Sequence, residues 1–330
     1  MSDFSSLLKQ FKGTARRAKE DSTSLQRKRP VDDNAKSKNT KRHRPSTEQR
    51  QSRPPPDQRD LTLNVSFFCI GAQKGGTTWL HDILRKHRSL SLPSQKEVHF
   101  WDWHRSKGLR WYSQQFPPGP KGVIKYGECT PCYVTLPERD IEEIKALFPE
   151  ARLIFVARDP VDRAWSALLM ELRNAVRGVE VGKFSIKDNS SSRLLGQIDR
   201  ESDPDNYDDD YFMDRLRHST HRDRCDYASG LRRWLKYFPK EQLLILDYKK
   251  IATDPRGFLE LVCDHIGVER GSLLDSLTDD ELKIRKNEAV GSTKDRNVRS
   301  TLRKEMEVFL QPFADEFNNL LQGLGYDLRI

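Results

Sequence analysis

The sequence lacks any long hydrophobic run, which limits the classes of protein that it can encode. Among its 330 residues no apolar stretch approaches the ~20 residues that a membrane-spanning helix needs. The N-terminus also lacks the apolar centre of a secretory signal. As written, the chain is expected to be cytoplasmic or nuclear and to have no transmembrane segment.

Cysteine is scarce as well. The five cysteines, Cys69, Cys129, Cys132, Cys225 and Cys263, are too few and too scattered for a disulfide scaffold. Cys129 and Cys132 form a single CxxC pair, with neither a second pair nor a nearby His in the sequence. We therefore expect ordinary thiols and no metal site.

Positive charge is concentrated at the N-terminus. Residues 1–60 contain 16 Lys and Arg against 8 Asp and Glu, a net charge of +8 out of +9 for the whole chain. This stretch has few large apolar residues, so it is expected to be a disordered basic tail that precedes a single domain at residues 61–330. Its basic clusters at 27–29 and 41–44 could serve as a nuclear address or contact anionic partners, although a solvated tail explains them equally well.

The remaining sequence alternates between apolar runs and helical patterns. Buried strands are expected at Val65–Gly71, Arg152–Ala157 and Leu243–Leu246. A helical pattern follows each of them, and the helix that starts at Val161 is preceded by Pro160 at a permissive early position. The pattern predicts a three-layer α/β domain with a mostly parallel sheet and helices on both faces.

Other stretches are less regular. Residues 178–226 are mostly polar, with an acidic run at Asp199–Asp214, and suggest an insertion or a mobile region that faces an acceptor. Leu302–Leu321 is expected to be a helix interrupted near Pro312. Arg163 is expected to be a solvated helix charge.

A glycine-rich segment, GAQKGGTTWL at Gly71–Leu80, connects the first strand to its helix. Backbone N–H groups and Thr hydroxyls at a helix N-terminus form an anion cradle, and Lys74 adds a full positive charge. The spacing is similar to a Walker A loop. That motif, however, needs Lys directly after the second Gly, where this chain has Thr77.

Several segments, taken in order, resemble sulfotransferases that use 3′-phosphoadenosine 5′-phosphosulfate (PAPS). The loop resembles the family's 5′-phosphosulfate loop. KEVHFWDW at Lys96–Trp103 and GLRWYSQQFP at Gly108–Pro117 resemble the heparan sulfate 3-O-sulfotransferase branch, and RDPVDRAWS at Arg158–Ser166 resembles the 3′-phosphate site. The resemblance covers residues 65 to about 325 and implies a P-loop-like sulfotransferase fold.

The resemblance also implies a role for individual residues. Glu97 would be the general base, supported by His99 and Asp102, while Lys74 would stabilise the leaving phosphate and Lys96 would lie near the acceptor. The residues expected to bind PAPS are Lys74, Gly75, Gly76, Thr77, Thr78, Trp79, Arg158, Ser166, Lys294 and Arg296.

The chemistry fits these residue types. Sulfuryl transfer is an in-line displacement, so positioning and stabilisation of the leaving charge dominate, and no metal is needed. A carboxylate such as Glu97 suits the role of base provided that burial raises its pKa. The acceptor would be a hydroxyl or an amine, with a carbohydrate as the first candidate.

Three departures from the 3-O-sulfotransferases leave the acceptor open. Cys129 stands where that branch has a lysine that contacts the sugar, and the segment Lys286–Arg296 has no cysteine for the branch's disulfide. The branch is held in the Golgi by an N-terminal anchor, which this sequence lacks as written; the Golgi lumen is the expected location if such an anchor is missing from the sequence. Acidic residues 208–210 would also repel a sulfated glycan that came close.

Other interpretations remain at this point. Leu243–Asp247 could be the Walker B strand of a kinase or NTPase that uses Mg²⁺-ATP, and a PAPS-binding protein without activity is a second alternative. Glu97 could be only a salt-bridge partner of Lys96, and His99 only a core histidine. The basic tail alone could bind nucleic acid.

Overall fold

The computed structural model describes residues 64–117, 125–176, 203–283 and 297–330. The predicted basic tail at 1–60 lies outside these ranges, as do Lys294 and Arg296.

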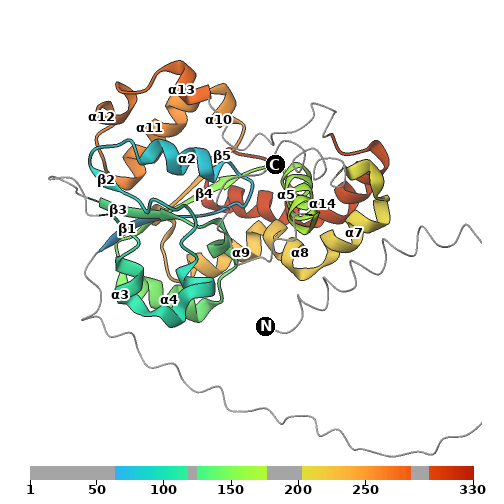
Figure 1. Cartoon of the computed structure of the whole chain (residues 1–330), viewed down its shortest axis with the longest axis horizontal. Coiled ribbons are helices and arrows are strands. Elements are labelled where there is room, and N and C mark those ends of the chain that lie inside the picture. Colours follow the sequence, from blue (N-terminus) through green and yellow to red (C-terminus); the bar gives the residue numbers. More distant parts are fainter. Residues whose placement is uncertain (1–63, 118–124, 177–202, 284–296) are drawn as a thin grey trace, which may run out of the picture. The chain divides into compact units, whose positions relative to one another are not determined.

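A five-stranded parallel sheet lies at the centre of the fold (Figure 1). Its strands are β1 (Val65–Gly71), β2 (Leu90–Ser91), β3 (Lys125–Cys129), β4 (Arg152–Ala157) and β5 (Leu243–Asp247). They are arranged in the order β2-β3-β1-β4-β5, and every adjacent pair is parallel. The predicted parallel α/β sheet is confirmed, as are its three expected strands, whereas β2 and β3 were not predicted.

Helices cover both faces of the sheet, because alternate side chains of β1 point to opposite sides. Phe68 and Ile70 belong to the same buried cluster as residues of α3 (Gly108–Ser113), α4 (Glu138–Leu147) and α9 (Tyr227–Leu235). Phe67 and Cys69 face α2 (Thr77–Leu84) and α11 (Pro255–Ile266) on the other side. Figure 1 shows these two layers above and below the sheet.

A third buried cluster joins α5 (Pro160–Val176), α7 (Asp209–Arg217) and α14 (Ser300–Leu324). The expectation of an irregular region is therefore wrong for residues 203–226, where α7 and α8 (Ser219–Cys225) form. The side chain of Asp208 accepts a hydrogen bond from the backbone N–H of Tyr211 and caps α7. Asp209 forms an ion pair with Arg299 at 2.7 Å, so part of the acidic run serves helix packing.

Two further expectations are corrected. α14 continues through Pro312, which lies on its exposed face, where water can satisfy the carbonyl group that loses its N–H partner. Arg163 is fully buried and not solvated, and its Nη2 lies 2.9 Å from Cys225 Sγ.

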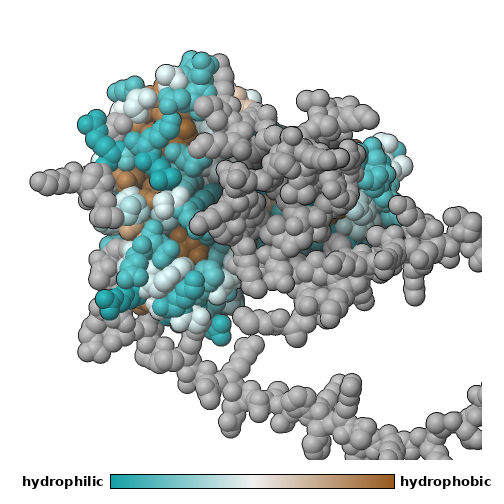
Figure 2. Space-filling view, viewed as in Figure 1, coloured by the Kyte–Doolittle hydropathy of each residue, from teal (hydrophilic) through white to brown (hydrophobic). Residues whose placement is uncertain are grey.

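The remaining helical segments are short. They are η2 (Phe100–His104), η3 (Arg105–Lys107), η4 (Pro131–Thr135), η5 (Pro204–Asn206), η6 (Lys240–Gln242), α10 (Lys250–Thr253), α12 (Gly271–Leu274) and α13 (Asp279–Lys283). In the described ranges, no helix has the length and apolar character needed to cross a membrane. The face seen in Figure 2 is mainly hydrophilic, with apolar residues in narrow patches between polar ones.

Candidate active site

The glycine-rich loop lies at the carboxyl edge of the sheet, where ligands bind in open parallel α/β folds. It connects the end of β1 at Gly71 to the first turn of α2 at Thr77. The chain order changes direction around β1, because β2 and β3 lie on one side of it and β4 and β5 on the other. Arg158 directly follows β4 and is therefore placed beside the loop.

Two glycines let the loop pack closely. A Cβ atom on Gly75 would lie 2.7 Å from the carbonyl oxygen of Val156 and 2.9 Å from that of Ala72. Gly76 has a φ of +78° and its Cβ would lie 2.4 Å from Ile251 Cδ1, so both positions require glycine. The backbone N–H groups in the first turn of α2 have no partners within the helix and remain available to a ligand at the end of the loop. This arrangement can bind a phosphate group.

Lys74 adds a half-buried cation to the loop, and its pKa is unusual. Burial is the main cause that lowers the pKa to about 8, and the positive charges of Arg158 and Arg173 lower it further. The negative charge of Glu97 opposes this change. Because positive groups gather around Lys74, an anion bound among them would be stabilised by all three.

Arg158 is held by the loop and by an aromatic ring. Its Nη1 donates a hydrogen bond to the carbonyl oxygen of Lys74 at 2.9 Å, and its guanidinium lies 4.6 Å from the ring centre of Tyr248. It forms no ion pair with an acidic residue of the described chain, so the alternative pairing with Asp159 or Asp162 is not seen. Ser166 is half-buried on α5, two turns after Arg158.

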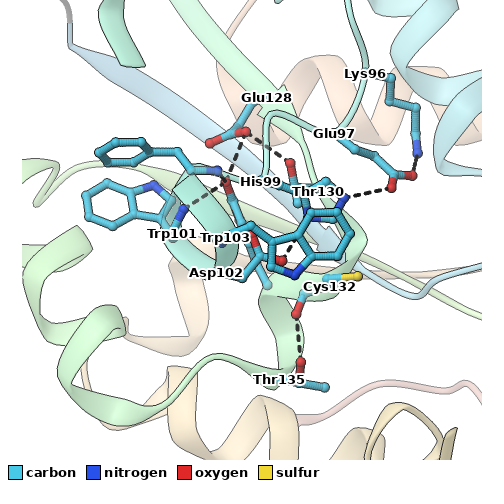
Figure 3. A network of polar contacts seen from close by, with 12 residues as sticks. Lys96, Glu97, His99, Trp101, Asp102, Trp103, Glu128, Thr130, Cys132 and Thr135 are labelled. Carbon is cyan, nitrogen blue, oxygen red and sulfur yellow. Dashed lines mark hydrogen bonds and ion pairs between the residues drawn. The ribbon is translucent and has the colours of Figure 1, made fainter. Parts of the chain in front are cut away.

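A chain of charged groups follows β2, formed by Lys96, Glu97, His99 and Asp102 (Figure 3). Lys96 forms an ion pair with one carboxylate oxygen of Glu97. The other oxygen lies 3.2 Å from His99 Nε2, while His99 Nδ1 lies 2.8 Å from Asp102. The Glu97 side chain is 35% exposed, which leaves its carboxylate within reach of a ligand.

The backbone that carries these groups is strained. Glu97 and His99 have φ values of +64° and +51°, which non-glycine residues rarely adopt. Hydrogen bonds compensate, since the N–H of Glu97 donates to the carbonyl of Cys129, at the end of β3. Trp103 stacks on the His99 ring with centres 3.6 Å apart and fixes its orientation.

The pKa values of Glu97 and His99 depend on each other. Burial favours the neutral form of Glu97, but the hydrogen bond from His99 and the charge of Lys96 outweigh it and lower the pKa to about 2. Burial likewise opposes the charged form of His99, yet its contacts with Asp102 and Glu97 raise the pKa to about 9. The expectation that burial raises the Glu97 pKa is therefore wrong, because its two cationic neighbours dominate.

Glu128 supports this segment through Tyr133. It is fully buried in β3 and accepts hydrogen bonds from Tyr112 at 2.6 Å, Thr130 at 3.1 Å and Tyr133 at 3.4 Å. The Tyr133 hydroxyl in turn accepts from the backbone N–H of Phe100 at 3.0 Å, at the start of η2. Burial is the main cause that raises the pKa of Glu128 to about 7.

The structure thus brings two sequence-distant groups of predicted residues to one edge of the sheet. Gly75, Gly76, Thr77, Thr78 and Lys74 form the loop region, and the Lys96–Asp102 segment is adjacent. Trp79 instead points into the core, where it packs on Phe258 and donates to the carbonyl of Leu282 at 3.1 Å.

Sequence reasoning did not identify Glu128, Tyr133, Cys132 and Arg173. In the sequence, the segment ECTP at Glu128–Pro131 stands out only because it lacks the lysine of the 3-O-sulfotransferases. Nothing in the segment indicates that Glu128 is buried. Cys132 lies close to His99 and Asp102 in space, although no His is near it in the sequence.

Known proteins share sequence and fold with this chain. Residues 65–311 match the family model described as the sulfotransferase domain. Heparan sulfate glucosamine 3-O-sulfotransferase 3B1 of Mus musculus is 32% identical over 205 residues, which are 62% of this chain and 46% of that protein. Membrane-associated sulfotransferase kil1 of Dictyostelium discoideum is 24% identical over 264 residues, covering 62% of this chain and 56% of the relative.

The chain spans about half the length of these curated relatives. Among solved structures, a sulfotransferase from Alicyclobacillus acidocaldarius superposes with a TM-score of 0.54 at 23% identity, over 81% of this chain and 98% of the other. That likeness concerns the fold. Together with the family match over most of the chain, it leads to one conclusion: the protein belongs to the sulfotransferase domain family.

Proposed function

We propose that the protein transfers the sulfuryl group of PAPS to a hydroxyl or amine of an acceptor, with Glu97 as general base. The observation that carries this proposal is the proximity of a cation, Lys74, to a carboxylate, Glu97. The half-buried ammonium of Lys74 lies close enough to Glu97 and Lys96 for both charges to affect its pKa. A cation for a leaving phosphate and a carboxylate for an acceptor proton thus share one site.

The loop residues fit the donor. PAPS would supply an activated sulfuryl group, with phosphates at its 5′ and 3′ positions. The tight glycine cradle and the N-terminus of α2 suit the 5′-phosphate, with Lys74 beside it. Arg158, which makes no ion pair with described acidic residues, and Ser166 are assigned to the 3′-phosphate.

Glu97 acts from the acceptor side. Its carboxylate is ionised at neutral pH, so it can accept a proton from an acceptor hydroxyl that forms a hydrogen bond with it. A pKa of about 2 makes the free carboxylate a weak base, and the acceptor must therefore displace Lys96 or loosen the contact with His99. His99 and Asp102 are positioning residues that hold the Glu97 side chain in place.

We also propose a carbohydrate acceptor, because the name of the Mus musculus relative specifies a heparan sulfate glucosamine. The matching stretch covers 46% of that protein, and Cys129 stands where the 3-O-sulfotransferases have the lysine that contacts the sugar. We therefore infer the class of acceptor and not heparan sulfate itself.

The kinase or NTPase alternative has less support. Asp247, the candidate Mg²⁺ ligand, accepts a hydrogen bond from the backbone N–H of Lys249 at 2.9 Å and so caps a turn after β5. The lysine of the loop is Lys74, and Thr77 occupies the Walker A lysine position.

A transfer assay with Glu97→Gln tests the proposed base. We expect this variant to lose about 10²- to 10⁴-fold in turnover of radiolabelled PAPS with an active glycan acceptor, because the amide cannot accept the proton. Binding of the desulfated product, 3′-phosphoadenosine 5′-phosphate, should change little.

Glu281→Gln is the matched control, because Glu281 also pairs with a lysine, Lys86, but on the surface. It should keep wild-type turnover. Wild-type turnover in Glu97→Gln would show that the base is another group.

A further inference from the structure

Cys132 lies beside the residues that position the proposed base. One sulfur, one imidazole nitrogen and one carboxylate oxygen, from Cys132, His99 and Asp102, all lie within 4.8 Å of one another. His99 precedes η2, Asp102 lies within it, and Cys132 comes from η4 (Figure 3). All three side chains are largely shielded from solvent.

We propose that these three residues form a binding site for a soft divalent cation of the Zn²⁺ type, and that occupancy of this site inhibits the enzyme. A thiolate, an imidazole and a carboxylate are the ligands that such ions prefer, whereas Mg²⁺ and Ca²⁺ prefer oxygen alone. Three protein ligands leave the fourth tetrahedral position to water.

The geometry needs only a small adjustment. Zinc holds its ligands at about 2.0 to 2.3 Å, which places neighbouring ligand atoms roughly 3.3 to 3.8 Å apart in a tetrahedron. The 4.8 Å limit on the present separations means that no pair of ligand atoms must close by more than roughly 1.5 Å, and His99 Nδ1 and Asp102, now 2.8 Å apart, must separate slightly. Nδ1 is the His99 nitrogen that would bind, because it already faces Asp102 at 2.8 Å.

Neighbouring groups support the three ligands. Trp103 stacks on the His99 ring, and the Thr135 hydroxyl donates to the Cys132 carbonyl at 2.8 Å, so both ligands are held by their surroundings. Arg224 Nη2 lies 3.7 Å from Cys132 Sγ and can donate to a thiolate, an outer contact common at metal sites. On binding, the thiol proton and the Nδ1 proton leave to solvent.

Inhibition follows from the identity of the ligands, and this part rests on the proposed function. A metal that binds Nδ1 and an Asp102 oxygen replaces the contact between these two groups, which are 2.8 Å apart. Because two protons leave, the net charge of the cluster does not change, but the imidazole ring must shift, and its Nε2 then no longer holds the Glu97 carboxylate in the position that proton transfer needs. Binding itself does not depend on sulfuryl transfer, so the two claims can be tested separately.

The binding claim is tested with Cd²⁺, whose bond to a thiolate gives a charge-transfer absorption band. We expect the full chain to bind one equivalent with this band. Cys263→Ala, which removes a thiol of α11 that is buried in the separate cluster with Phe67 and Cys69, should behave identically. Cys132→Ala should lose the band and at least about 10- to 100-fold in affinity, the range expected when only an outer contact of a metal site is removed, and Mg²⁺ should not compete.

Asp102→Asn provides a second variant in case Cys132→Ala does not fold, and it should weaken Cd²⁺ binding over a similar range while keeping the band. An unchanged band and affinity in Cys132→Ala, or no stoichiometric binding to the wild-type protein, would overturn the site.

The inhibition claim is tested by assaying transfer with Zn²⁺, each protein being compared with its own rate in chelator. Zn²⁺ should inhibit the wild type and Cys263→Ala but not Cys132→Ala. Stoichiometric Cd²⁺ binding without Zn²⁺ inhibition would contradict the inhibitory role only. Metal binding in a protein with no transfer activity would contradict the proposed function and leave the site intact.

Discussion

In the proposed mechanism the ammonium group of Lys74 and the carboxylate of Glu97 carry the chemistry of the site, and their neighbours set their charges. Lys74 is surrounded by cations and titrates at about pH 8, while Glu97 lies between two cations and stays ionised down to about pH 2. His99, with a pKa of about 9, is an imidazolium at neutral pH. The site therefore holds the opposite charges that a donor phosphate and an acceptor proton require.

The lowered pKa of Lys74 predicts a loss of activity at alkaline pH. In the proposed mechanism the ammonium form of Lys74 binds the phosphosulfate, and this form predominates below about pH 8. The value of kcat/KM for PAPS should therefore fall about tenfold per pH unit above that pH. A pH–rate profile checks this, with Lys74→Arg as the comparison.

The guanidinium of Lys74→Arg stays charged, so the fall should move to higher pH in this variant. A fall at the same pH in both proteins would assign it to another group, such as His99.

Glu128 predicts a pH effect on stability. Its pKa is about 7 in the folded protein and lower in the unfolded chain, so its contribution to stability is present at pH 4.5 and is lost as the pH rises through 7. The loss is about 3 kcal/mol over this range. Urea unfolding at pH 4.5 and pH 7 measures it.

Glu128→Gln cannot ionise and should lack this part of the pH dependence while remaining folded. An equal pH dependence in wild type and variant would show that Glu128 is not the group responsible.

At the scale of elements, strands were predictable where apolar residues form a run. β1 and β4 are such runs and have the expected bounds. β3, with the sequence KYGEC, was missed because its charged Glu128 reads as exposed, whereas three hydroxyl groups satisfy it in the interior. The distant partners that bury a polar residue cannot be recognised from local sequence.

Of the candidate site, too, only part could be predicted from the sequence. Lys74 and the segment around Glu97 could be identified from the sequence because their residues are contiguous and resemble a known family. The closeness of Cys132 to His99 depends on the packing of η4 beside η2, which no spacing in the sequence reveals.

The continuous helix α14 predicts the effect of a substitution at Pro312. Proline in a helix interior lacks an N–H donor and lowers the stability of the helix by up to about 3 kcal/mol. Because Pro312 is exposed, its replacement disturbs no core contact. Pro312→Ala should raise the free energy of unfolding by about 1 to 3 kcal/mol, measured with urea.

Glu305→Ala, at another exposed position of α14, should change the free energy of unfolding by less than about 0.5 kcal/mol. A destabilised Pro312→Ala would mean that the helix needs the proline, for example to maintain a bend.

At the scale of the whole molecule, the order of the strands places the site. β3, β1 and β4 are adjacent, and their carboxyl ends carry Cys129, the glycine-rich loop and Arg158 respectively. The parallel arrangement therefore brings together the proposed donor cradle at Gly71–Leu80, the proposed acceptor carboxylate Glu97 and Arg158, which come from three separate segments of the sequence. The match of residues 65–311 to the sulfotransferase domain covers all these segments.

The donor specificity tests this account most directly. Calorimetric titration of the full chain with 3′-phosphoadenosine 5′-phosphate should show tight binding without added metal, and Mg²⁺-ATP should bind much more weakly. Arg158→Ala should lose most of the affinity for the former, because it removes the proposed 3′-phosphate contact. Preference for Mg²⁺-ATP, or unchanged affinity in Arg158→Ala, would contradict the assignment of this site to PAPS.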